Sequence, residues 1–172
     1  IIKAAKKSNL ECIFKRPKNI SGDRISDHSV LIHALKAAEN LKKKKIDIIL
    51  LVQPTSPLRK VVHIKNVIKK IVDQKLDSVW TVSKADLKFH PLKQLILKKN
   101  ILSHYNKKGK KIIARQQLTN TYYRNGVVYA VTRELILKNK NLISNKSTGY
   151  LINTPQISID TVKDLKLASL LM

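Results

Sequence analysis

The chain has 172 residues, 43% of them hydrophobic, which is enough for one globular domain with a sizeable core. It contains no apolar run long enough to cross a bilayer and no signal-peptide pattern, so we expect no membrane partner. The single cysteine, Cys12, excludes an internal disulfide framework and favours a cytoplasmic location. Because no His/Cys cluster surrounds it, Cys12 is predicted to be a small buried apolar residue.

The formal net charge of +24 admits two interpretations. It fits a nucleic-acid or anionic-membrane partner, or it reflects lysine enrichment without a binding function. The lysines are scattered over predicted helix faces and turns, aromatic residues make up 5% of the chain, and no RNA- or DNA-binding motif is present. We therefore expect no specific nucleic-acid partner, only weak nonspecific binding that is sensitive to salt.

The opening segment 1–9 has the pattern of the second half of an amphipathic helix. We therefore expect the natural N-terminus to lie upstream and this chain to be a fragment. A short strand is predicted at 11–17. A helix capped by Ser26 or Asp27 is predicted to run to about Lys43. Its apolar face consists of Val30, Leu31, Ala34, Leu35, Ala38 and Leu41.

The next elements alternate between strand and helix. The run 46–52 has no polar alternation, which predicts a strand buried on both sides, as in a parallel sheet. An amphipathic helix is predicted at about 60–74 and another strand at 77–83. This order indicates an α/β fold with right-handed crossovers. Ligands of such sheets bind beyond the carboxyl ends of the strands, which is where residues 53–59 lie.

Residues 86–121 interrupt this alternation. Two strand-like pieces, PLKQLIL and KKIIARQ, flank the turn-rich segment 106–110, which predicts an inserted hairpin. A strand at 121–131 follows, with a turn at Asn125-Gly126. Three further elements are predicted: a short helix at 132–138, a strand at about 148–153 and a last helix capped by Thr161.

The segment LVQPTSPLR (51–59) groups an amide, two hydroxyls and a guanidinium. Hydroxyls and backbone N–H groups suit a polyhydroxylated ligand, and the planar fork of Arg59 suits a carboxylate or phosphate. The alternative is a strand-to-helix turn in which Thr55 or Ser56 caps the next helix.

Asp160 precedes the last predicted helix, where its carboxylate is either a ligand for a divalent metal or a helix cap. Arg115 ends the inserted hairpin, where a solvated strand end is the alternative to a binding role. The five histidines show no convincing metal-ligand spacing.

Read in order, several segments resemble one family, the acylneuraminate cytidylyltransferases. These are the CMP-sialic acid synthetases and their relatives that activate legionaminic and pseudaminic acids. The matching segments are RPKNISGD, LIHAL, LVQPTSPLR, DSVWTVS, ARQQL, YYRNGVVYAVTREL and ISIDTVKDLKLA. They cover essentially the whole chain, and LVQPTSPLR is the most specific of them.

The resemblance implies a Rossmann-like nucleotide-diphospho-sugar transferase fold, with a mostly parallel sheet and an inserted dimerisation hairpin at 90–118. It implies a single cytidylyltransferase domain over 1–172 that acts as a homodimer. The implied reaction joins CTP to a nine-carbon 2-keto (nonulosonic) sugar acid, giving the CMP-sugar and pyrophosphate for surface polysaccharide. The implied cofactor is Mg²⁺.

The resemblance also implies roles for individual residues. Arg16 would face the substrate phosphates, and Asp160 would bind the metal; these two are the candidate catalytic residues. The candidate substrate-binding residues are Gln53, Thr55, Ser56, Arg59, Arg115, Asn125 and Gly126. Arg115 is also a candidate to reach the partner subunit's site.

The chain departs from the family pattern at several points. The glycine- and basic-rich loop that grips CTP is absent, because the chain starts after it. Ser158 replaces the first of two metal-binding aspartates, and Ala114 and Gln117 replace a basic residue and an aspartate. We therefore expect the fragment alone to be inactive or very weak. The alternatives are a degenerate noncatalytic relative, a basic nucleic-acid-binding module and, less favoured, a 3-deoxy-manno-octulosonate cytidylyltransferase.

Overall fold

A computed structural model describes residues 2–172, which form two compact units. Unit 1 consists of Ile1–Gln53, Arg59–Trp80 and Val128–Gly149. Unit 2 consists of Pro54–Leu58, Thr81–Val127 and Tyr150–Met172. The insertion predicted at 90–118 falls wholly within unit 2.

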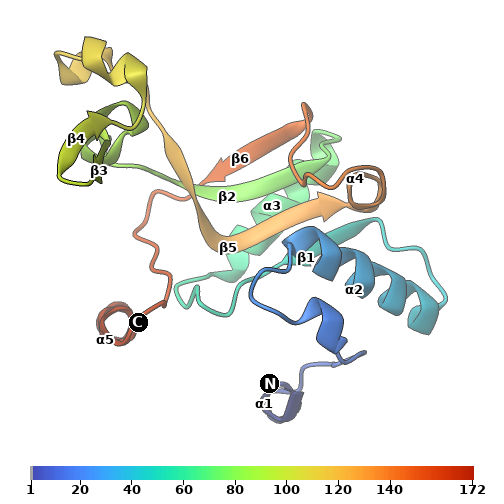
Figure 1. The fold of residues 1–172 in the computed structure, drawn as a ribbon. Coiled ribbons are helices and arrows are strands. Elements are labelled where there is room, and N and C mark those ends of the chain that lie inside the picture. Colours follow the sequence, from blue (N-terminus) through green and yellow to red (C-terminus); the bar gives the residue numbers. More distant parts are fainter. Residues whose placement is uncertain (1) are drawn as a thin grey trace. The chain divides into compact units, whose positions relative to one another are not determined.

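Four strands of the described chain form the main sheet, in the order β1-β5-β2-β6 (Figure 1). They are β1 (Ile48–Leu51), β5 (Tyr122–Thr132), β2 (Ser78–Lys84) and β6 (Ser147–Leu151). β1 pairs antiparallel with β5. The backbone bonds Thr132 N to Asp77 O and Ala85 N to Thr121 O make β2 antiparallel to β5 as well.

β6 runs parallel to β2, because Asp77 N donates to Lys146 O and Ile152 N donates to Val82 O. β1, β2 and β6 therefore share one direction, and β5 lies among them in the opposite direction. The predicted α/β fold is confirmed, but the sheet is mixed rather than mostly parallel in its pairing, because β5 pairs antiparallel with both β1 and β2 and only β2 and β6 pair parallel.

β5 is the most deeply buried strand, and its residues from Asn125 to Val131 are all buried. The turn predicted at Asn125-Gly126 is wrong, because the chain continues through it as one strand. Gly126 has a φ of 73°, a value that glycine adopts without strain. The side-chain oxygen of Asn125 accepts a hydrogen bond from Val127 N across this glycine.

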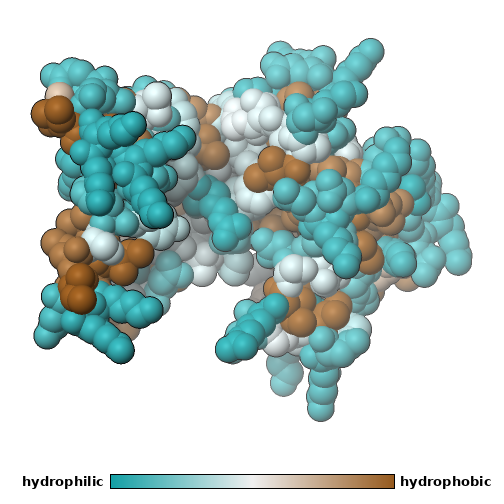
Figure 2. Space-filling model, turned by 45° about the horizontal axis from the view of Figure 1, so that its top comes forward, coloured by the Kyte–Doolittle hydropathy of each residue, from teal (hydrophilic) through white to brown (hydrophobic). Residues whose placement is uncertain are grey.

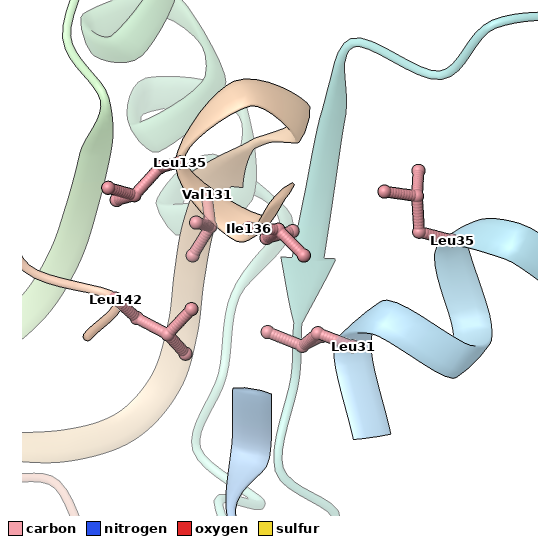
Figure 3. Close-up of a cluster of buried hydrophobic side chains, with 6 residues drawn as sticks. All are labelled: Leu31, Leu35, Val131, Leu135, Ile136 and Leu142. Carbon is pink, nitrogen blue, oxygen red and sulfur yellow. The ribbon is translucent and has the colours of Figure 1, made fainter. Parts of the chain in front are cut away.

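Helix α2 (Asp27–Lys42) supplies much of the core of unit 1. It begins as predicted, because the Ser26 side chain accepts a hydrogen bond from Ser29 N. Leu31 and Leu35 then pack in a cluster with β5 and with helix α4 (Arg133–Lys138). Figure 3 shows the members of this cluster: Leu31, Leu35, Val131, Leu135, Ile136 and Leu142.

An ion pair and a histidine join α2 to α4 beside this cluster. Arg133 Nε lies 2.8 Å from Glu39 Oε1, and both side chains are partly buried. His28 is near the beginning of α2, and its Nε2 atom lies 2.9 Å from the carbonyl oxygen of Ile136 in α4. These polar contacts fix how α2 and α4 cross over their shared apolar face.

Three predictions for unit 1 are wrong. Residues 11–17 form no strand; they lie along α2, held by the Glu11–Lys42 ion pair and by the Phe14 and His33 rings, whose centroids are 5.0 Å apart. Cys12 in this segment is exposed rather than buried. β1 is only half-buried, because it ends the four-strand order and pairs with β5 alone.

The insertion is a hairpin of β3 (Leu95–Lys98) and β4 (Ile101–His104), but its turn is not at 106–110. Lys99 and Asn100 make the turn, with φ of 49° and 61°. This geometry is typical of a two-residue hairpin turn, in which asparagine is favoured. KKIIARQ forms two 3₁₀ turns, Lys107–Lys111 and Arg115–Gln117, rather than a strand.

The remaining helices are α1 (Ile2–Lys7), α3 (Val61–Asp73) and α5 (Val162–Leu171). The first two belong to unit 1 and the last to unit 2. In the part of the chain that the structure describes, no helix has both the length and the apolar character needed to cross a bilayer.

The burial of α2 leads to a test of the core. Leu35 is 0% exposed and Leu41, on the same helix, is 56% exposed. We expect Leu35→Ala to lower the free energy of unfolding by about 2–5 kcal/mol, because it leaves a cavity in the cluster. The matched control Leu41→Ala should change it by less than about 0.5 kcal/mol. Urea denaturation measures both, and equal losses would contradict this packing.

Candidate functional site

The loop between β1 and α3 carries most of the candidate residues. Pro54 and Pro57 lack the N–H groups that would continue the strand. The segment Pro54–Leu58, called the 54–58 loop below, belongs to unit 2. Within it the side chain of Thr55 is partly exposed, whereas Ser56 is 1% exposed.

Two hydrogen bonds hold the 54–58 loop inside unit 2. The Ser56 hydroxyl donates to the carbonyl oxygen of Asn125 at 3.2 Å. The carbonyl oxygen of Thr55 accepts from Ile159 N at 2.9 Å. The loop is therefore fixed both to β5 and to the segment that leads to Asp160, so three of the motif segments meet here.

Asn125 is held by its own side chain. It is 6% exposed, its Nδ2 donates to Ser83 Oγ at 3.0 Å, and its Oδ1 accepts from Val127 N. Sequence reasoning missed Ser83. The available signal was its position in β2, since Val79, Thr81 and Ser83 alternate along one buried face, and a buried hydroxyl there needs a partner.

Arg59 and Gln53, which flank the 54–58 loop in the sequence, both belong to unit 1. Arg59 Nη1 and Nη2 both donate to the carbonyl oxygen of Gln53 at 3.0 Å. Burial lowers the pKa of Arg59 from its ordinary value, but a guanidinium remains charged at neutral pH. Arg59 therefore fixes the Gln53 backbone, and the Gln53 side chain stays partly exposed.

Neither Thr55 nor Ser56 caps α3, so that alternative is wrong. Lys60 occupies the N-cap position, and its N–H donates to Nδ1 of His63 at 3.2 Å. His63 is 7% exposed. Burial, with a smaller contribution from the charge of Lys60, lowers the pKa of His63. The neutral ring is the form that accepts this bond and begins the helix.

Asp160 does not cap α5 either. Thr161 and Asp164 form the cap: the Asp164 carboxylate accepts from Thr161 Oγ1 at 2.7 Å, and Asp164 N donates to Thr161 Oγ1. The bond from the Thr161 hydroxyl, together with the Thr161 and Asp160 N–H groups, lowers the pKa of Asp164. The Asp160 side chain is exposed beside this cap.

The protein donors for a metal are few. Among residues 2–172, no group of three His, Cys, Asp or Glu side chains could hold an ion. Asp160 and the exposed Ser158 are the oxygen donors that the predicted motif supplies. This set fits Mg²⁺ only in the manner of nucleotide enzymes, where one or two carboxylates bind an ion that substrate phosphates also hold.

Arg16 lies in a separate hollow of about 720 Å³ within unit 1. Its lining includes the basic residues Lys3, Lys15 and Arg16 and the acidic residue Glu11. Cys12 and Phe14 also line it, and the contacts of the 11–17 segment with α2 keep it in place. Clustered cations suit a phosphate or carboxylate ligand.

Arg115 lies apart from the loop contacts, within the insertion. It is exposed and lines a hollow of about 260 Å³ with His104 and Gly109. Gly109 is required there, since a Cβ would lie 2.2 Å from the carbonyl oxygen of Leu92. The structure thus joins Ser56 to Asn125 and Thr55 to Ile159 by hydrogen bonds but shows no such bond from Arg115 to these residues.

Comparison with known proteins gives the fold. No protein-family model matches the chain. A structure of CMP:2-keto-3-deoxy-manno-octonic acid synthetase complexed with CTP is similar, with a TM-score of 0.61 and 13% sequence identity over 98% of this chain and 75% of that one. The chain has a nucleotide-diphospho-sugar transferase fold.

A second solved structure agrees. It is a protein from Bacillus anthracis, described as a glucose-1-phosphate thymidylyltransferase, in complex with sucrose. Its TM-score is 0.53, with 9% identity over 99% of this chain and 68% of that one. At these identities the similarity shows the architecture alone.

The buried His63 ring at the beginning of α3 predicts how the free energy of unfolding depends on pH. Its folded pKa is below that of the unfolded chain, so acid protonates the unfolded state first and the folded state loses relative stability. Below about pH 6.5, the ordinary pKa of histidine, we expect the free energy of unfolding to fall faster in the native chain than in His63→Gln. Gln keeps an acceptor at this helix position without titrating.

Urea denaturation at several pH values measures this difference. The other histidines are present in both proteins, so their contributions cancel in the comparison. A difference between the two proteins that does not change with pH would contradict the role of neutral His63.

Proposed function

We propose that this chain is a cytidylyltransferase of the acylneuraminate type, which activates a nonulosonic acid with CTP for surface-glycan biosynthesis. The observation that carries the proposal is the meeting of three motif segments in unit 2. The 54–58 loop is bonded both to Asn125 on β5 and to the residue before Asp160. The nucleotidyltransferase fold supports the same reaction class.

The proposed reaction is a phosphoryl-group substitution. The anomeric hydroxyl oxygen of the sugar acid forms a bond to the α-phosphorus of CTP, the bond to the bridging oxygen breaks, and pyrophosphate leaves with its electron pair. The hydroxyl proton is released to solvent. Negative charge accumulates on the phosphates, so cationic groups such as Arg16 favour the transition state.

The partly exposed groups of the loop would bind the sugar acid. Gln53 and Thr55 offer an amide and a hydroxyl for the sugar hydroxyls and carboxylate. Ser56 and Asn125 would act by holding the loop backbone, because their side chains are buried and hydrogen-bonded. Gly126 would shape the strand beside Asn125, and Arg59 would hold the Gln53 backbone.

We further propose that Mg²⁺ is the cofactor and that Asp160 supplies one of its ligands. Bound Mg²⁺ would neutralise phosphate charge. Asp160 is suited to this role because the cap of α5 is made by Thr161 and Asp164, which leaves the Asp160 side chain exposed. A cytoplasmic location, where CTP is available, would fit the reaction.

A noncatalytic relative is the second candidate, favoured by one observation. Ser158 stands where the family has an aspartate, so a single carboxylate remains for the metal. Such a protein would keep the sugar-acid loop and bind its ligand without turnover.

Calorimetric titration of the 172-residue chain with N-acetylneuraminic acid tests the proposal. We expect binding, weakened roughly tenfold in Thr55→Ala through loss of one ligand hydrogen bond. The control Thr148→Ala, on β6 in unit 1, should bind like the native chain. Absence of binding by the native chain to this acid, to legionaminic or pseudaminic acid and to 3-deoxy-manno-octulosonic acid would overturn the proposal.

Pyrophosphate release from CTP with Mg²⁺, where it is observed, excludes the noncatalytic relative. Little or no turnover is expected from this chain, and turnover that Asp160→Asn abolishes would establish catalysis. Binding of a sugar acid without CTP binding in any longer form of the protein would favour the noncatalytic relative.

We also propose a homodimer formed through the β3–β4 hairpin. Figure 2 shows hydrophobic side chains (brown) at the surface on the left, where the hairpin lies in Figure 1. The exposed large hydrophobic residues of this segment are Leu95, Ile96, Leu97, Ile101, Leu102, Tyr105 and Ile113. A monomer rarely exposes so many neighbouring apolar side chains.

The charge of the hairpin predicts how dimerisation depends on salt concentration. Residues 90–118 contain eight basic residues and no acidic ones. Two copies of the hairpin would repel each other at low salt, so we expect association to strengthen as salt is added. Sedimentation velocity at low and high salt measures this.

A substitution in the hairpin tests the interface itself. Ile101 is 70% exposed, and Ile101→Asn should weaken dimerisation by about tenfold or more if it lies near the interface centre. The control Leu10→Asn changes an exposed leucine in unit 1 and should have no effect. A native chain that stays monomeric at all salt concentrations would exclude the dimer.

A further inference from the structure

We infer that Ser83, on β2, is a positioning residue that sets the 54–58 loop through Asn125. The inference deepens the proposed function and rests on it where it concerns the sugar acid. The residues that carry it all belong to unit 2, so the chain of contacts lies within one compact unit.

The first contact joins Ser83 to the Asn125 side chain. Asn125 Nδ2 donates to Ser83 Oγ at 3.0 Å, and each residue is 6% exposed. This bond selects one of the two orientations of the amide group. With Nδ2 toward Ser83, Oδ1 is the atom that accepts from Val127 N at 3.2 Å.

The second contact carries this orientation to the loop. Val127 N and the Asn125 side chain bracket Gly126, so the backbone at 125–127 has one defined path. On that path the Asn125 carbonyl oxygen accepts from the Ser56 hydroxyl, and Ser56 is 1% exposed. A buried hydroxyl without a partner is unfavourable, so the loop follows the position of this carbonyl.

The third contact extends the effect beyond the loop. Thr55 precedes Ser56, and its carbonyl oxygen accepts from Ile159 N at 2.9 Å. Ser83 therefore stands at one end of a series of hydrogen bonds that passes through Asn125 and Ser56 and ends next to Asp160. The partly exposed Thr55 side chain lies in the middle of this series.

This geometry assigns Asn125 a holding role rather than direct ligand binding. Its amide already bonds Ser83 and Val127, and its small exposed fraction leaves little surface for a ligand. Removing the Ser83 hydroxyl would leave Asn125 Nδ2 without a partner in a buried place, and rotation of the amide would then release the backbone that holds Ser56.

The test compares Ser83→Ala with Ser78→Ala in the 172-residue chain. Ser78 is the matched control, because it is a buried serine of the same strand whose hydroxyl donates to Ser147 Oγ at 2.7 Å, in unit 1. Both substitutions delete one buried hydroxyl. Ser83→Thr retains the hydroxyl and should restore native behaviour.

Amide hydrogen exchange gives a readout that needs no ligand. We expect Ser83→Ala to speed exchange at Ile159, whose N–H bonds Thr55, by about tenfold, while Ile152, whose N–H bonds Val82, keeps its native rate. Native exchange at Ile159 in Ser83→Ala, or equal acceleration at Ile152, would overturn the inference, because the effect would then be absent or a general loosening of β2.

Binding of N-acetylneuraminic acid provides the functional readout. Ser83→Ala should bind about tenfold more weakly, while Ser78→Ala and Ser83→Thr bind like the native chain. Native affinity in Ser83→Ala, or equal losses in Ser83→Ala and Ser78→Ala, would overturn the inference. If the native chain binds no sugar acid, the proposed function fails, and the exchange comparison still decides whether Ser83 holds the loop.

Discussion

The seven consecutive buried residues of β5, from Asn125 to Val131, are the constraint on which the rest of the structure depends. A strand this deeply buried must satisfy every backbone polar group, and it does so by pairing with β1 and β2. Its apolar end at Val131 contributes to the core with α2 and α4. Its polar end at Asn125 holds the 54–58 loop. One strand thus supplies packing at one end and positions the candidate site at the other.

The large positive charge explains why so much of the remaining structure is exposed. With 35 basic and 11 acidic residues, most lysines have no carboxylate to pair with and must stay in solvent. The compact state therefore carries self-repulsion that salt would relieve. The partly buried Arg133–Glu39 pair fixes α2 against α4, and the pKa of Glu39 is lowered chiefly by the hydrogen bond from Arg133.

Local signals in the sequence predicted the elements whose conformation is decided locally. Three such signals are the capping serine of α2, the apolar period of α3 and the Thr161 cap of α5. Each depends on residues close to it in the sequence. Predictions failed where distant contacts decide. Residues 11–17 have the composition of a strand, but they lie along α2 without a pairing partner. The hairpin turn was misplaced for another reason: Lys99 and Asn100 form a two-residue turn with positive φ, and the turn-rich composition of 106–110 drew the prediction away from them.

The same distinction applies to the candidate site. The sequence identified the loop, because prolines after an apolar run end a strand whatever surrounds them. It did not reveal which polar side chains face a ligand. Ser56 and Asn125 have the same chemical capacity as Thr55 and Gln53, yet burial commits the first two to holding the backbone and leaves the second two partly exposed. The role of Ser83 was missed for a related reason: its place on a buried face could be read from the sequence, but its partner lies 42 positions away. Under the proposed function, the buried groups give this loop one shape, and that shape positions the exposed groups for a ligand.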